Sequence, residues 1–170
     1  NMDTLDSDGA LPIDGHGWSV YPGLIDAHTH LGIWEDGMGF EGADGNEDTD
    51  PCTPHLRAMD AVNPRDFCFR EAVAASPGSS NPIGGQVVLL KTAGTHVDHM
   101  QIPGKAPMKM ALGENPKNEY RNKNQMPVTR MATAAIIREQ LLKTQRYSEE
   151  LLRAQQEDEE KPEFDMKCEA

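Results

Sequence analysis

Two histidines, His28 and His30, stand two positions apart, shortly after the apolar residues Leu24 and Ile25. Side chains in a β-strand alternate between its two faces, so in a strand both imidazoles would project to one side and Thr29 to the other. Neutral imidazole nitrogens bind divalent ions such as zinc, iron, nickel and manganese. The spacing therefore predicts a metal-binding pair. A His-x-His pair also arises by chance, and the alternative is two partly exposed histidines that close a strand.

The residues before the pair must position it. A Pro-Gly pair at 22–23 predicts a turn, and the apolar run after it predicts a short buried strand that leads to the histidines. Further upstream, the alternation of apolar and polar residues predicts strands at about 11–13 and 18–20, joined by a turn at 15–17. His16 lies between the two glycines of that turn, so we expect it to be an exposed turn residue and not a ligand.

The rest of the chain mixes expected strands and helices. The apolar run at 86–92 predicts a strand, and residues 106–112 predict another. Thr129 is expected to cap a long helix from Arg130 to about Gln156, whose apolar residues follow a helical stripe. Three further elements are expected: a helix at 54–62 that Thr53 would cap, a helix from about 64 to 75, and an edge strand at 96–102.

A second pair of histidines, His96 and His99, lies in the segment that is expected to be extended. Residues three apart in a strand face opposite sides. We therefore expect these two side chains to point in different directions, and we do not count them as a metal pair.

Two loops are candidates for binding a substrate. The loop after the histidine pair is acidic over 35–50, and its carboxylates could recognise a cationic group or could simply face solvent. The loop at 76–85 is rich in glycine and proline, so its backbone amides could face a ligand. It contains Ser79 and Asn81, which together with His55 are the candidate substrate-binding residues.

Charge and composition exclude several classes of partner. The chain of 170 residues carries 16 basic and 28 acidic residues, a net charge of −12, which argues against nucleic acid because phosphate binding needs a basic surface. No apolar stretch has the length of a membrane span. Three cysteines without paired spacing predict a reducing compartment and hence a cytoplasmic location. Both ends look cut, so we expect a fragment of a longer protein.

Four blocks of sequence carry a family likeness: PGLIDAHTHLG at 22–32, DP at 50–51 with DAVNP at 60–64, PGSSNPIGG at 77–85 and MKMALGENPK at 108–117. Together they resemble the imidazolonepropionase-like branch of the amidohydrolase superfamily. The resemblance implies an α/β fold, a TIM (β/α)₈ barrel flanked by a small β-sandwich. Such a barrel needs at least about 200 residues. We therefore expect a partial barrel, with residues 1–22 as a remnant of the sandwich strands and residues 23–170 as the incomplete N-terminal half.

The same resemblance implies a set of metal ligands. His28 and His30 match the ligands of the first barrel strand, and Glu114 matches the carboxylate of the fourth. Some members carry a carboxylated lysine there, for which Lys91 is the rival candidate. Zinc is the expected metal, with iron, manganese or nickel as alternatives, and it would activate water for attack on an amide-type carbon. No histidine follows Glu114, so the later ligands of such barrels are missing.

Two functions are compatible with these features. The first is a metal-dependent hydrolase of a C–N bond in a small-molecule amide, lactam or cyclic amide, present as an incomplete fragment. The second is a non-catalytic, truncated copy that has no activity or needs a partner, either a second copy in a homo-oligomer or the missing C-terminal half. An open half-barrel exposes strand edges and apolar faces, and these favour association.

Overall fold

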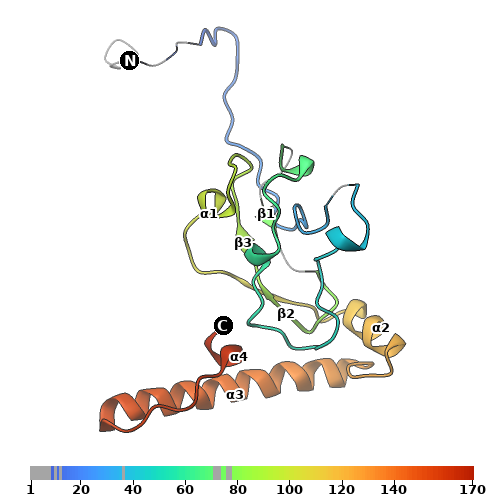
Figure 1. Cartoon of the computed structure of the whole chain (residues 1–170), viewed down its shortest axis with the longest axis vertical. Helices are drawn as coiled ribbons and strands as arrows, with labels where there is room; N and C mark the ends of the chain where they lie inside the picture. Colours follow the sequence, from blue (N-terminus) through green and yellow to red (C-terminus); the bar gives the residue numbers. More distant parts are fainter. Residues whose placement is uncertain (1–8, 10, 12, 36, 71–73, 76–77) are drawn as a thin grey trace.

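The computed structural model describes residues 9, 11, 13–35, 37–70, 74–75 and 78–170. Its body consists of short strands, turns and loops, and one long helix, α3 (Arg130–Glu157), runs along one end of it (Figure 1). The N-terminal part leaves the other end of the body as an extended arm. None of the described helices combines the length and the apolar content that a membrane crossing requires.

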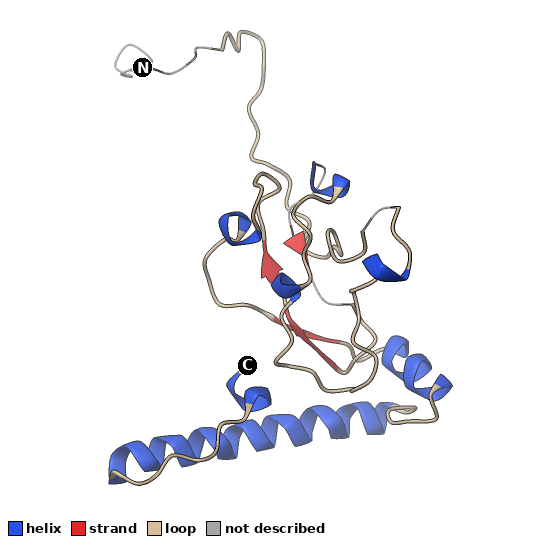
Figure 2. Cartoon of the chain, in the orientation of Figure 1, coloured by secondary structure: helices blue, strands red, loops and turns tan. Residues whose placement is uncertain are grey.

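The described strands form two separate antiparallel pairs (Figure 2). The β2–β4 pair shifts its register at Gly85, where φ is 122° and a Cβ atom would lie 2.6 Å from the carbonyl oxygen of Leu56. Only glycine fits this bulge without strain. The pairs are β1 (Ala74–Ala75) with β3 (Val88–Leu89), and β2 (Ile83–Gln86) with β4 (Met108–Met110).

These antiparallel pairs differ from the predicted partial barrel, whose neighbouring strands would be parallel. The strand predicted at 106–112 is present as β4, but the run at 86–92 is divided between β2 and β3. The division falls where the backbone changes partners: Gln86 N donates to Leu56 O at 2.7 Å, and Val87 N donates to Pro107 O at 2.8 Å. An apolar run identifies a strand, whereas distant segments decide how it pairs.

The hydrophobic core anchors the segment that directly follows the histidine pair. Gly32 adopts φ 70°, and a Cβ atom there would lie 2.3 Å from Cε2 of the buried Phe69 ring. Only a glycine at position 32 therefore allows the backbone to pass this close to the ring. The core cluster consists of Ile33, Ala58, Val62, Phe69, Val88, Leu90 and Met100.

Two helices are predicted before residue 76, at 54–62 and from about 64 to 75. The described residues of these segments form only short 3₁₀ turns, so both predictions are wrong for them. They are η3 (Ala58–Asp60) and η4 (Phe67–Arg70), while η2 (Phe40–Gly42) lies in the acidic loop. Thr53 does not cap a helix, because its side chain is buried and its hydroxyl donates to Ile83 O at 3.2 Å. This tertiary contact overrides the local capping signal. Residues 71–73 of the second predicted helix lie outside the described residues.

Two other segments are helical against expectation. α1 (Val97–Met100) replaces the edge strand predicted at 96–102, and the rings of His96 and His99 lie 5.9 Å apart between centroids. The prediction that they point in different directions is therefore wrong, since residues three apart on a helix share a face. α2 (Glu114–Asn122) forms in a segment for which no helix was predicted. Its Pro116 sits in the first turn, where a missing backbone N–H costs nothing.

α3 agrees with the prediction to within one residue at its C-terminal end. It begins at Arg130, directly after Thr129, and the Thr129 hydroxyl accepts a hydrogen bond from Ala132 N at 3.1 Å. It ends at Glu157, and the C-cap residue Asp158 adopts a left-handed conformation with φ 54°. A side-chain cap and a left-handed C-terminal residue are the ordinary boundaries of a helix.

α4 (Met166–Glu169) folds back on α3 and ties it to the body. The Gln140 side chain of α3 donates to the carbonyl oxygen of Lys167 at 2.8 Å, and Lys167 Nζ donates to Asp50 Oδ2 at 2.6 Å. The acidic loop, α3 and α4 are therefore connected by hydrogen bonds near the C-terminus.

The strands predicted before the histidine pair do not form in the described residues. Residues 18–26 carry no strand, and the side chains of Leu24 and Ile25 are 91% and 83% exposed. The prediction that these two residues form a buried strand is wrong, because no described segment lies beside them to bond their backbone and cover their side chains. The segment at 11–13 lies partly outside the described residues. His16 is exposed in a turn, as predicted.

Candidate metal centre and adjoining cavity

The structure brings His28 and His30 together without a strand. Their ring centroids are 5.2 Å apart, and the ring planes meet edge to face at 81°. A bend produces this approach: the backbone N–H of His28 donates to Asp26 Oδ1 at 3.0 Å, and the carbonyl oxygen of His30 accepts from Ile33 N and from Trp34 N, each at 3.1 Å. The core that holds Ile33 therefore fixes the position of His30.

Lys109 of β4 is the closest cationic group to this pair. Its Nζ lies 3.4 Å from both ring nitrogens of His28. The positive charge of Lys109 lowers the pKa of His28, with smaller contributions from burial and from His30. Burial in turn lowers the pKa of Lys109. The lowered pKa of His28 favours its neutral form, which can donate an electron pair, but Lys109 Nζ lies beside both of its ring nitrogens.

The remaining predicted ligands belong to other elements of the fold. Glu114 is exposed in the first turn of α2, and Lys91 is exposed just after β3. Within the described part of the chain, no three side chains of His, Cys, Asp and Glu come close enough to hold a metal ion together. The structure thus contains a histidine pair, while the complete ligand set stays a prediction.

A polar cavity of about 320 Å³ adjoins His30. The Trp34 ring lies against the His30 ring, with centroids 5.1 Å apart, and forms an aromatic part of the wall. Ser79 lines the same cavity, and its hydroxyl oxygen accepts a hydrogen bond from Asn115 Nδ2 at 2.5 Å. The wall also contains three further asparagines and one acid: Asn46, Asn118, Asn122 and Glu119.

Asn81 does not reach this cavity. Its side chain is 3% exposed and is fully engaged, because Oδ1 accepts from the Tyr120 hydroxyl at 2.7 Å and Nδ2 donates to Glu47 O at 2.7 Å. Nδ2 also lies 3.2 Å from the Thr53 hydroxyl. The structure places Asn81 as a buried link between loops, outside the lining of the cavity beside His30.

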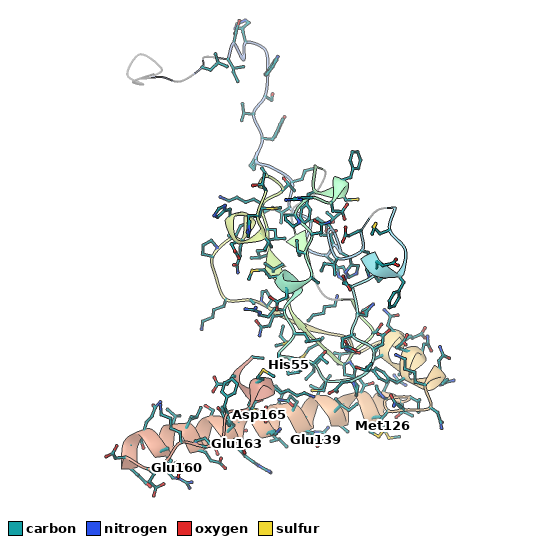
Figure 3. The ribbon with its side chains drawn as sticks, viewed as in Figure 1. His55, Met126, Glu139, Glu160, Glu163 and Asp165 are labelled. Carbon is teal, nitrogen blue, oxygen red and sulfur yellow. The ribbon has the colours of Figure 1, made fainter. Side chains whose placement is uncertain are left out.

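His55 faces the C-terminal helices (Figure 3). It lines a separate cavity of about 560 Å³ together with Lys143, Phe164 and Asp165. Its Nδ1 atom is buried and has no hydrogen-bond partner. The structure therefore does not bring His55 to the histidine pair.

Much of the acidic loop is engaged within the chain. Glu35 accepts from Asn63 Nδ2 at 2.5 Å, the carbonyl oxygen of Asp48 accepts from Lys123 Nζ at 2.7 Å, and Asp50 bonds to Lys167. A cavity of about 420 Å³ lies beside the loop and is lined by Asp44, Glu47, Arg57 and Asp60 among others. Arg57 pairs with Asp60 there, at 2.6 Å, so one acid of this wall is already neutralised.

Sequence reasoning missed Lys109, Trp34 and the asparagines of α2 as neighbours of the pair. Of these residues, only Lys109 could have been singled out from the sequence, because it is the one polar residue of a short apolar strand, between Met108 and Met110. The approach of Trp34 and α2 depends on long-range contacts that no local pattern encodes.

Comparison with known proteins identifies relatives of this chain, although no family model matches it. The amidohydrolase tasK of Hapsidospora irregularis is 33% identical over an alignment of 144 residues, and the match covers 72% of this chain and 14% of that protein. The crystal structure of an amidohydrolase from Thermotoga maritima matches with a TM-score of 0.83 and 41% identity, over 88% of this chain and 41% of that one. The chain spans less than half of either relative. These similarities support the amidohydrolase family and an α/β fold of the kind found in that structure.

Proposed function

We propose that this chain, as part of an amidohydrolase, contributes two metal ligands and a wall of the substrate cavity to a metal-dependent hydrolase. The bond cleaved would be a C–N bond in a small-molecule amide, lactam or cyclic amide. The observation that carries the proposal is the contact between the rings of His28 and His30, 5.2 Å apart, beside a polar cavity. Both relatives are named amidohydrolases, which supports the reaction class.

The donor chemistry fits a divalent metal. Imidazole nitrogens suit zinc, iron, manganese and nickel, and zinc is the ion that we propose. When bound by His28 and His30, an ion of this kind would supply Lewis-acid activation of water near neutral pH. The residues of the cavity would orient the substrate. Because Asn115 donates to the Ser79 oxygen, the hydrogen of the Ser79 hydroxyl is available for a substrate carbonyl.

Lys109 is our first candidate for a third ligand. As an ammonium group it opposes a cation beside His28. Loss of one proton from the Lys109 ammonium gives the neutral amine. Addition of CO₂ to this amine forms a carbamate and releases a second proton, so that the positive charge is replaced by a negative one. Its lowered pKa favours the neutral amine that this addition requires. Glu114 is the alternative ligand, and Lys91, exposed after β3, has less support.

Zinc retention by the isolated chain tests the proposal. The chain would be equilibrated with zinc in the presence and absence of bicarbonate, desalted, and its metal content determined by elemental analysis. We expect about one zinc per chain in the wild type and none in a His28→Ala/His30→Ala variant. A His96→Ala/His99→Ala variant is the matched control, because it removes another pair of neighbouring rings, 5.9 Å apart.

The third ligand is resolved by two further variants. Loss of a bicarbonate-dependent gain in Lys109→Ala would support the carbamate, whereas loss of zinc in Glu114→Gln would favour the carboxylate. Equal zinc in the wild type and in the His28→Ala/His30→Ala variant would contradict the proposed metal site.

A second candidate is a non-catalytic copy that acts only with a partner. One observation favours it: within the described residues, no three side chains of His, Cys, Asp and Glu form a cluster that could hold a metal ion. Under this alternative the zinc-loaded chain would hydrolyse no member of a panel of amides and lactams. Light scattering on the same sample would report whether the chain forms a homo-oligomer.

A further inference from the structure

Two cysteines contact the same buried carboxamide, that of Gln140 in the middle of α3. The thiol of Cys52 donates to Gln140 Oε1 with 3.7 Å between sulfur and oxygen, and Cys168 Sγ lies 3.9 Å from Gln140 Nε2. Oε1 and Nε2 are bonded to one carbon atom. The two sulfur atoms therefore belong to one small cluster, although the cysteines lie far apart in the sequence.

The backbones that carry these cysteines are held beside each other by two hydrogen bonds. Asp50, two residues before Cys52, accepts from Lys167 Nζ at 2.6 Å, and Lys167 directly precedes Cys168. Gln140 Nε2 also donates to the carbonyl oxygen of Lys167 at 2.8 Å. A disulfide requires Cα atoms within about 7 Å of each other. Because α4 has only four residues and follows a stretch without regular structure, a small displacement of α4 and a rotation of the Gln140 side chain are enough to join the sulfur atoms.

The two thiols differ in their access to a reagent. Cys52 is half-buried and Cys168 is buried, so Cys52 is the sulfur that a small oxidant reaches first. Burial raises the pKa of the Cys52 thiol, while the charges of Lys167 and Lys143 oppose this effect. The thiolate is the reactive form, so its reaction is faster at mildly alkaline pH than at pH 7. The third cysteine, Cys68, belongs to η4 in another part of the fold.

We propose that Cys52 and Cys168 form a redox-modification site, at which hydrogen peroxide oxidises the two thiols to a disulfide that joins the end of the acidic loop to α4. The Cys52 thiolate attacks one oxygen of the peroxide, the O–O bond breaks, and one water leaves, which gives a sulfenic acid. The Cys168 sulfur then attacks the Cys52 sulfur. The S–S bond forms, the S–O bond breaks, and the leaving hydroxide takes the thiol proton of Cys168 as a second water.

The disulfide would change what holds α4 in place. In the reduced chain the attachment uses the ion pair between Asp50 and Lys167, which protonation of Asp50 removes. In the oxidised chain a covalent bond replaces that dependence, because a cross-link keeps its two segments together whatever their charge. The site is separate from the metal chemistry proposed above, so the two proposals can fail independently.

Disulfide mapping tests the pairing. The reduced chain would be treated with hydrogen peroxide at mildly alkaline pH, alkylated, digested without reductant and analysed by mass spectrometry. We expect a bridge between Cys52 and Cys168 within one chain, which dithiothreitol reverses, and an alkylated Cys68. Cys68→Ser should form the same bridge. Asp50→Asn should form it about two- to fivefold more slowly, because the ion pair no longer holds the segments together. Asp60→Asn is the matched control and should keep the wild-type rate, since Asp60 pairs with Arg57.

A second measurement needs no variant. Hydrogen exchange of residues 166–169 would be compared at pH 3 in the oxidised and the reduced wild-type chain. We expect the oxidised chain to keep its protection there and the reduced chain to lose it. Four outcomes would overturn the proposal: equal exchange in the two forms, a bridge that contains Cys68, bridges only between chains, or oxidation of Cys52 to a sulfinic acid without any bridge.

Discussion

The hydroxyl of Tyr120 donates a 2.7 Å hydrogen bond to Oδ1 of Asn81, and the two side chains are 0% and 3% exposed. The amide nitrogen of Asn81 extends the connection to the carbonyl oxygen of Glu47 at 2.7 Å. One buried network thus joins α2, the loop at 78–82 and the acidic loop. Because the cavity beside His30 is lined by residues of these same segments, the network fixes its walls.

Replacement of Tyr120 by Phe would leave Asn81 Oδ1 buried without a donor. An unsatisfied buried acceptor costs about 1–3 kcal/mol, so we expect the free energy of unfolding to fall by that amount. Urea denaturation measures it. Tyr147→Phe is the control, because the Tyr147 hydroxyl donates to the exposed Glu169, where water can replace it, and we expect a loss below about 0.5 kcal/mol. Similar losses in the two variants would refute a special role for the network.

Replacement of Gly32 by Ala would affect both the backbone and the core. The residue adopts φ 70°, and the new Cβ would lie 2.3 Å from the Phe69 ring. Backbone strain and overpacking together predict a loss of more than about 2 kcal/mol of unfolding free energy. Gly23→Ala is the control, since its Cβ would meet no atom within 4 Å. A melting temperature unchanged in Gly32→Ala would show that the close approach to Phe69 does not constrain the fold.

Local signals predicted those elements that depend on few distant contacts. The start of α3 follows from Thr129, whose hydroxyl caps the helix through a neighbour three residues away. The short apolar run that contains β4 predicts a strand regardless of which segment pairs with it. The proximity of His28 and His30 also follows from their spacing, although a bend rather than a strand brings the rings together.

The errors concern residues whose partners lie far away in sequence. Thr53 has a side chain that is typical of a helix cap, but its hydroxyl donates instead to the carbonyl oxygen of Ile83, thirty residues later. Asn81 was predicted to face a ligand from a loop, but its side chain is buried and hydrogen-bonded to Tyr120 and to the backbone of Glu47. His55 follows the acidic loop in sequence, but it faces α3 and α4 instead of His30. No local pattern encodes such pairings, so residue type alone gives the candidates and not their positions.

The link between Asp50 and Lys167 predicts a dependence on acid pH. Burial by itself raises the pKa of Asp50, but the hydrogen bond and charge of Lys167 and the Cys52 backbone N–H outweigh it, so the pKa lies below the ordinary value of 3.8. A depressed pKa means that the carboxylate contributes stability above its unfolded pKa and loses it as the pH falls through the folded one.

We therefore expect the attachment of α4 to weaken below about pH 4, since Asp50 becomes protonated there. Hydrogen exchange of residues 166–169 between pH 7 and pH 3, corrected for the intrinsic rate, measures the attachment. In Asp50→Asn the protection should be low already at pH 7. Asp60→Asn removes a separate ion pair with Arg57 and should leave these amides unchanged. Acid-independent protection in the wild type would contradict the assignment.

The position of Lys109 predicts how zinc affinity responds to a change of charge. Its Nζ lies 3.4 Å from both ring nitrogens of His28, so Lys109→Glu replaces a repelling group by a carboxylate beside the pair. Unit charges about 4 Å apart interact by about 1–4 kcal/mol between bulk water and a protein surface. The variant should accordingly bind zinc at least about tenfold more tightly in competition with a chromogenic chelator. Lys105→Glu makes the same change in net charge in the exposed loop before β4 and should have little effect. An equal gain in both variants would show that total charge, and not the contact between Lys109 and His28, governs the affinity.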